Sequence, residues 1–136
     1  MIEVDQFKHY NDSFGHRQGD TALYSLSRAL EQSARSYNGI VVRYGGDEFV
    51  VILPFVGSQE ALPIAEEIRD ETYRAVSDLL AAHQLPALLL SIGVATFPDD
   101  ACTAGELIEA ADRAMYVVKH NGGNGIHVSS WSRVTA

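Results

Sequence analysis

The chain has 136 residues, 46% of them hydrophobic and 21% charged, which predicts one soluble globular domain spanning residues 1–136 and leaves no room for a second. Its formal net charge of -8 opposes binding to nucleic acid or to an anionic membrane, so a phosphate ligand needs local cations. A single cysteine, Cys102, excludes an intramolecular disulfide and a thiolate metal cluster and suits a reducing cytoplasm, and the sequence predicts neither a signal peptide nor a membrane span.

The first third of the chain predicts a strand end, an irregular segment and a long helix. Residues 1–5 are typical of the end of a strand, whereas residues 7–20 are polar and interrupted by glycines, which favours a loop or a short irregular helix. From Thr21 onward apolar residues recur at helical spacing, and Asp20 is a candidate N-cap for that helix.

The middle of the chain predicts a β-hairpin followed by a second helix. Residues 40–44 and 49–53 are short β-branched and aromatic runs, and the glycines between them permit the positive φ of a tight turn. Asp47 and Glu48 therefore lie at the tip of that turn. Ser58 is a candidate N-cap for a helix that extends to about Leu80.

The last third predicts a buried strand, a third helix and an edge strand. Residues 88–97 are almost continuously apolar, and Gly93 among them indicates a bulge or a close contact. Thr103 and Glu106 match a capping box, and the apolar stripe that follows includes Met115. Residues 126–128 complete a strand and helix order typical of an α+β, ferredoxin-like sandwich with an extra hairpin, whereas Trp131 in the polar tail is expected to pack locally.

Two acidic clusters stand where predicted strands end: Glu3 with Asp5, and Asp47 with Glu48. If neighbouring strands bring them together, the carboxylates repel one another and raise each other's pKa unless a cation neutralises them. Hard oxygen ligands of this kind suit Mg²⁺, which takes one or two carboxylates together with phosphates and water. Composition alone equally allows a simple solvated acidic turn.

Short motifs at fixed intervals surround these acids. They are Asp5-Gln6-Phe7-Lys8, Asn11-Asp12, Gly15-His16, Gly19-Asp20, the segment from Arg43 to Phe49, the strand from Leu90 to Ala95, and Ala111 to Tyr116 with Lys119. Over residues 2–128 the ordered set resembles the GGDEF domain of diguanylate cyclases. The resemblance implies a nucleotidyl-cyclase-like fold and the condensation of two GTP into cyclic di-GMP with release of two pyrophosphates.

The resemblance also implies a metal and catalytic site. The carboxylates of Glu3, Asp47 and Glu48 and the main-chain carbonyl of Val4 are expected to bind two Mg²⁺ ions, or Mn²⁺ in their place. Glu48 is further expected to help deprotonate the attacking 3′-hydroxyl, and Lys8 contacts phosphate, so that Asp47, Glu48 and Lys8 are the expected catalytic residues.

The expected substrate-binding residues follow from the same resemblance. Asn11 and Asp20 match the positions that read guanine, and Lys119 matches a phosphate contact. The amides around Phe7 match the phosphate loop, and Gly45 and Gly46 form the turn of the half-site. If the other motif residues were absent, each of these residues would be interpreted more simply, as a cap, as part of a tight turn or as a surface lysine.

The reaction implied by the resemblance also requires partners. Each subunit presents one GTP, so catalysis requires a homodimer, with a sensory domain or protein as a further partner and no nucleic acid or membrane contact. The chain departs from the family pattern because the family's first helix and half-strand precede its first residue, which predicts exposed apolar surface, a rearranged dimer or domain swapping. Glu3 replaces an aspartate, and Gly123 replaces a phosphate-binding arginine. The aligned stretch Ser36-Tyr37-Asn38-Gly39 lacks the arginine and aspartate of the inhibitory product site.

Two other classes of function stay open. A degenerate GGDEF domain could bind GTP, or act through protein contacts, without turnover. An adenylyl-cyclase-like or polymerase-palm enzyme would use the same two-metal mechanism, although Asn11 and Asp20 as guanine-reading residues argue against it.

Overall fold

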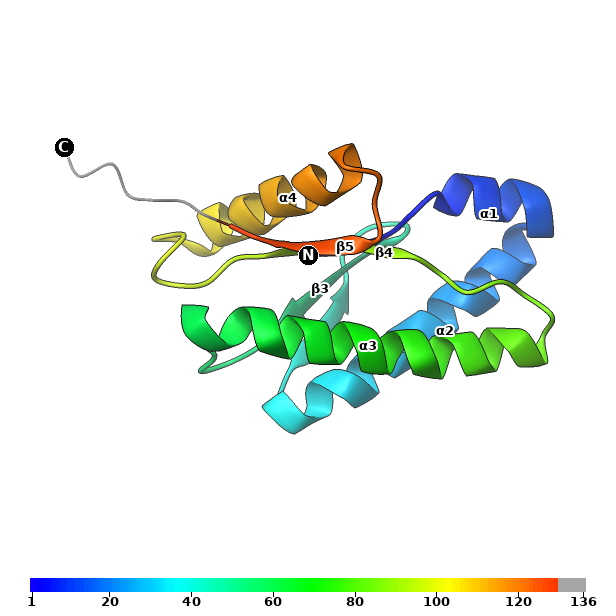
Figure 1. Cartoon of the computed structure of the whole chain (residues 1–136), viewed down its shortest axis with the longest axis horizontal. Helices are drawn as coiled ribbons and strands as arrows, with labels where there is room; N and C mark the ends of the chain where they lie inside the picture. Colours follow the sequence, from blue (N-terminus) through cyan, green and yellow to red (C-terminus); the bar gives the residue numbers. More distant parts are fainter. Residues whose placement is uncertain (130–136) are drawn as a thin grey trace.

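The computed structural model describes residues 1–129 and shows a mixed sheet with helices on both faces (Figure 1). Trp131 lies outside the described residues. The strands are β1 (Ile2–Val4), β2 (Ile40–Arg43), β3 (Glu48–Ile52), β4 (Leu90–Val94) and β5 (Gly125–Val128). The helices are α1 (Phe7–Phe14), α2 (His16–Ala34), α3 (Ser58–Ala82) and α4 (Ala104–His120), with a 3-10 turn, η1 (Arg35–Tyr37), after α2.

The strand order within the described part of the chain is β2-β3-β1-β4-β5, so the short β1 is central. It pairs antiparallel with both β3 and β4, whereas β4 and β5 are parallel and α4 connects them. Figure 1 shows α4 on one face of the sheet and α2 and α3 on the other. This arrangement confirms the α+β sandwich predicted from the order of the elements.

Successive side chains of β1 alternate between the buried core and the opposite face of the sheet. Ile2 and Val4 are buried in the core that also contains Phe49 of β3, whereas Glu3 between them is only partly buried. Because successive side chains of a strand point to opposite faces, Glu3 points away from that core. The strand therefore places one carboxylate on the face that α4 covers.

A close contact between α4 and the sheet lies at Gly93 of β4. A Cβ at this position would lie 1.9 Å from the Ala111 carbonyl oxygen and 2.3 Å from the Met115 backbone nitrogen. The close contact predicted for Gly93 is thus confirmed, because only a residue without a side chain lets the helix backbone rest on the strand. The capping box at the start of α4 is confirmed as well, with Thr103 Oγ1 accepting from the Glu106 N–H at 3.2 Å.

Residues 7–20 form α1 and the start of α2, so the short helix is the correct alternative for this segment and the loop is wrong, and the long helix begins before Thr21. Gly15, with φ of 89°, separates α1 from α2, and its interruption of the helical period concealed the extent of α1 and the start of α2 in the sequence. Asp20 lies inside α2 and caps nothing, since Gly15 is the N-cap residue. Likewise Gly57, not Ser58, is the N-cap of α3, and its N–H donates to the Glu60 carboxylate at 3.5 Å.

An apolar strip is exposed on β2 and β3. Ile40, Val42 and Ile52 are 55%, 43% and 50% exposed, and Ile40 lies directly opposite Ile52 in the antiparallel register. Within residues 1–129, no helix combines the length and apolar character needed to cross a bilayer.

Candidate active site

Glu3 and Glu48 lie opposite each other on adjacent strands. The antiparallel register of β1 and β3 pairs Glu3 with Glu48 and Ile2 with Phe49, and the Val4 N–H donates to the Asp47 carbonyl oxygen at 3.2 Å. Directly opposed residues in such a pair have Cβ atoms about 5 Å apart. The two acidic clusters of the sequence therefore meet at one end of the β1 and β3 pair.

The electrostatics of Glu48 show that these acids interact. Burial raises the pKa of the Glu48 carboxyl, the negative charges of Glu3, Asp47 and Asp112 raise it further, and the ammonium of Lys119 opposes them. Sequence reasoning missed Asp112. The signal that could have found it is its spacing from Lys119, because residues seven apart on a helix lie on one face.

Lys119 joins the carboxylates from the last turn of α4. Its ammonium forms an ion pair with the Glu3 carboxylate, and both side chains are partly buried. A cation at the C-terminal end of a helix is also favoured by the helix dipole. The contact places a cation that could bind phosphate beside the acidic rim, which is the end of the β1 and β3 pair where Glu3, Asp47 and Glu48 lie.

The hairpin turn bonds to the backbone of Glu48 and leaves no room for a side chain at Gly45. The N–H groups of Tyr44 and Gly45 donate to the Glu48 carbonyl oxygen at 2.8 and 3.3 Å, and the Arg43 guanidinium donates twice to the Gly46 carbonyl oxygen, at 2.6 and 3.1 Å. A Cβ at Gly45 would lie 2.4 Å from Glu48 Oε2, whereas a Cβ at Gly46 meets no atom within 4 Å. Neither glycine uses the positive φ that the sequence permits.

Asn11, Phe7 and Asp20 gather where α1 packs on α2. A Cβ at Gly19 would lie 1.8 Å from Asn11 Oδ1 and 3.1 Å from the tip of the Phe7 ring, so the missing side chain of Gly19 lets the helices approach. Asn11 Oδ1 is buried and has no hydrogen-bond partner. Asp20 follows Gly19 and is exposed. A buried acceptor without a donor is costly, and it lies in the contact between the two helices.

The start of α1 lies just beyond β1. Gln6 has a left-handed φ of 54°, and the Tyr10 N–H is the donor to its carbonyl oxygen at 3.0 Å. The amides of the first helical turn precede that bond and have no acceptor within the helix. Lys8 in this turn is exposed.

The carboxylates do not form a complete metal cage by themselves. Within residues 1–129, no three His, Cys, Asp or Glu side chains are arranged to hold a metal ion together. Glu3 and Glu48 provide two facing carboxylates, and the Glu3 carboxylate is engaged by Lys119. Any cation here would need further oxygen ligands, as Mg²⁺ takes from phosphates and water.

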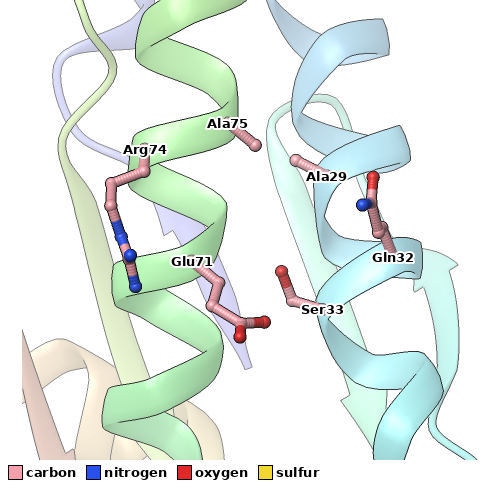
Figure 2. A pocket seen from close by; sticks show the side chains of 6 residues that line it. All are labelled: Ala29, Gln32, Ser33, Glu71, Arg74 and Ala75. Atoms are coloured by element: carbon pink, nitrogen blue, oxygen red, sulfur yellow. The ribbon is translucent and has the colours of Figure 1, made fainter.

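A separate pocket lies between α2 and α3, on the other face of the sheet. Figure 2 shows Ala29 and Ala75 facing each other across it, with Ser33 and Glu71 nearer its other end. Gln32 and Arg74 complete its lining. It contains no residue that the sequence predicted for function.

Comparison with known proteins agrees with these motifs. The family described as "Diguanylate cyclase, GGDEF domain" matches residues 1–125. Diguanylate cyclase DosC of Escherichia coli K12 is 38% identical over 131 residues, which cover 94% of this chain and 27% of DosC. Response regulator PleD of Caulobacter vibrioides is 34% identical, with 93% of this chain and 28% of PleD covered. The chain thus spans about a quarter of the length of these curated relatives.

Solved structures show the same fold. The GGDEF domain of YfiN, also called TpbB, from Pseudomonas aeruginosa superposes with a TM-score of 0.81 at 31% identity, covering 96% of this chain and 80% of that one. The GGDEF domain of DgcB from Caulobacter crescentus, solved in complex with c-di-GMP, gives 0.76 at 25% identity, covering 96% and 75%. With its family motifs, its fold and nearly its whole length matched, the chain belongs to the GGDEF family of diguanylate cyclase domains.

Proposed function

We propose that this chain is the catalytic domain of a diguanylate cyclase, which condenses two GTP into cyclic di-GMP and releases two pyrophosphates. The observation that carries the proposal is the opposition of Glu3 and Glu48 across β1 and β3, with Lys119 at the same rim. The proposal is supported by relatives named as diguanylate cyclases, including DosC and DgcM of Escherichia coli.

The two facing carboxylates at the rim support a site for divalent metal ions whose remaining ligands come from phosphates and water. Glu3, Asp47, Glu48 and the carbonyl oxygen of Val4 would hold two Mg²⁺, or Mn²⁺ in their place. Burial and, after it, the neighbouring carboxylates of Glu3, Asp47 and Asp112 raise the pKa of Glu48, and a divalent cation would relieve the repulsion between these carboxylates. Bound metal would polarise the phosphate oxygens and offset the charge of the triphosphate.

The guanine base would bind between α1 and α2. Asp20 is exposed and can accept the N1 and N2 hydrogens of guanine, and Asn11 would contact the base once its Oδ1 turns away from Gly19. Adenine has no N–H at N1, so it would leave an acceptor unpaired at a cost of about 1–3 kcal/mol.

The triphosphate would lie between the start of α1 and the end of α4. Lys8, the amides around Phe7, and Lys119 supply positive potential there, which an acidic protein needs in order to attract a polyanion. Gly45 and Gly46 keep the turn free of side chains beside it.

The reaction would join two such sites. The 3′-oxygen of one GTP attacks the α-phosphorus of the other, the bond to pyrophosphate breaks, and the proton of the hydroxyl passes to the Glu48 carboxylate. Since each chain carries one half-site, the proposal requires a homodimer. An activating partner is compatible with it, as the relative SiaD was solved in complex with its activator SiaC.

Product analysis tests the proposal. The chain is incubated with Mg²⁺ and either GTP or ATP, and the products are separated. Cyclic di-GMP from GTP alone, lost in Glu48→Gln, is the expected result. GTP binding without product would indicate a non-catalytic module, and a cyclic mononucleotide would contradict the proposal.

A further inference from the structure

The carboxylate of Asp5 joins three segments that are far apart in the chain. Asp5 follows β1, and its N–H donates to the Leu89 carbonyl oxygen at 2.8 Å. Its Oδ1 accepts from the Ser91 hydroxyl of β4 at 2.6 Å, and its Oδ2 accepts from the Asn124 N–H at 2.7 Å. Hydrogen bonds to a charged acceptor are stronger than those between neutral groups, so this side chain links β1, β4 and the turn between α4 and β5.

The turn after α4 is shaped around this carboxylate. Gly123 has a φ of 78°, and a Cβ there would lie 2.8 Å from Asp5 Oδ2. Asn124 has a left-handed φ of 51°. The turn is also bonded back to the helix, because the Gly122 and Gly123 N–H groups donate to the carbonyl oxygens of Lys119 and Val118 at 3.1 and 3.0 Å. A restraint on Asn124 is therefore passed to the last turn of α4.

Two contacts thus locate α4 on the sheet. The backbone contact at Gly93 fixes the middle of the helix, and the bonds to Asp5 fix the turn that follows it. Lys119 lies between these points and faces Glu3. We propose that Asp5 is a positioning residue that holds the end of α4 so that the Lys119 ammonium lies at the acidic rim. This inference rests on the proposed function in one respect, namely that Lys119 contacts the triphosphate.

Asp5 could instead be a metal ligand, since it lies two residues after Glu3. Its surroundings argue for the structural assignment, because both carboxylate oxygens already accept short hydrogen bonds, and one donor, Ser91, is fully buried. Asparagine separates the two assignments. Its carbonyl can accept from the Asn124 N–H and its amide can donate to the Ser91 hydroxyl, whereas its loss of charge would weaken a metal ligand.

The first test measures amide hydrogen exchange by NMR in Asp5→Ala and Asp5→Asn, with Glu66→Ala on the exposed surface of α3 as the control for a lost acid. We expect exchange at Gly122, Gly123 and Asn124 to become at least about tenfold faster in Asp5→Ala and to stay within about threefold of the unmodified chain in the other two. Unchanged exchange in Asp5→Ala, or an equal effect of Asn and Ala, would overturn the proposal. If Asp5→Ala does not fold, Ser91→Ala removes one bond and should accelerate the same amides.

The second test links the turn to Lys119. We expect Asp5→Ala to raise the KM for GTP at least about tenfold, Asp5→Asn to restore it, and Asp5→Ala to add less than about twofold in a Lys119→Ala background. Independent effects of the two substitutions would refute positioning through Lys119. If the unmodified chain makes no cyclic di-GMP from GTP, the proposed function fails, while the exchange data still decide whether Asp5 holds the end of α4.

Discussion

Replacing Gly45 with alanine should displace the Glu48 carboxylate while the hairpin stays folded. The new Cβ would lie 2.4 Å from Glu48 Oε2, where ordinary contacts begin at 3.4 Å, so the two must separate by about 1 Å. The atom that yields is the end of a flexible side chain, and the backbone of Gly45 has no positive φ to strain. The free energy of unfolding should therefore change by less than about 1 kcal/mol.

The same displacement is large for a reacting group. A misplacement of about 1 Å can lower the rate of a positioned reaction about a hundredfold. We therefore expect the initial rate of cyclic di-GMP formation in Gly45→Ala to fall by about that factor, and the pKa of Glu48, measured by NMR of its side-chain carboxyl, to change.

Gly46→Ala is the matched comparison, because a Cβ there meets nothing within 4 Å. It should leave the Glu48 pKa and the unfolding free energy unchanged. Any loss of activity would then indicate that a substrate or a second subunit contacts the turn. If Gly45→Ala keeps both the Glu48 pKa and the rate of the unmodified chain, the steric reasoning is refuted.

Three further substitutions test other parts of the site. Because the pKa of Glu48 is raised on folding, the folded chain binds the proton more tightly, and stability is lost as pH rises through that pKa. Glu48→Gln should therefore gain stability over the unmodified chain as pH rises from acidic to neutral, and urea unfolding of both at several pH values checks this; a constant difference would contradict it. Asp20→Ala should reduce the preference for GTP over ATP about 10- to 100-fold, measured as the ratio of kcat/KM values, and an unchanged ratio would exclude Asp20 as a guanine reader. Gly93→Ala should lower the free energy of unfolding by about 3 kcal/mol or more, because its Cβ meets the backbone of α4, whereas Gly105→Ala, with open space around it, should be neutral or stabilising.

The pairing of Glu3 with Lys119 bears on the change from aspartate to glutamate at this position. The longer side chain reaches the ammonium at the end of α4, and the ion pair holds a metal-binding candidate and a phosphate-binding candidate together. An arginine at Gly123 would meet the Asp5 carboxylate at its Cβ and would require a residue with a side chain to adopt a φ of 78°. The turn after α4 is thus built for glycine, and Lys119 is the cation that this helix brings to the rim.

Local features of the fold could be predicted from the sequence because neighbouring residues specify them. The capping box of Thr103 and Glu106 depends on residues three apart. The apolar run predicted as a buried strand over residues 88–97 is buried in its centre, as β4, but the strand is shorter than predicted, and Leu89 and Phe97 outside it are exposed. The same reasoning could not choose between a loop and a short helix for residues 7–20, because Gly15 interrupts the helical period and the polar residues lie on exposed faces of α1 and α2.

The sequence by itself determined which acids, lysines and glycines the chain carries and in which motifs. Only the tertiary structure decided that Glu3 lies opposite Glu48, that Asp112 and Lys119 act on the same carboxylates, and that Asp5 bonds to Asn124. The physical reason is that helix caps and strand periodicity arise within a few residues, whereas these contacts depend on strand register and on where α4 rests on the sheet.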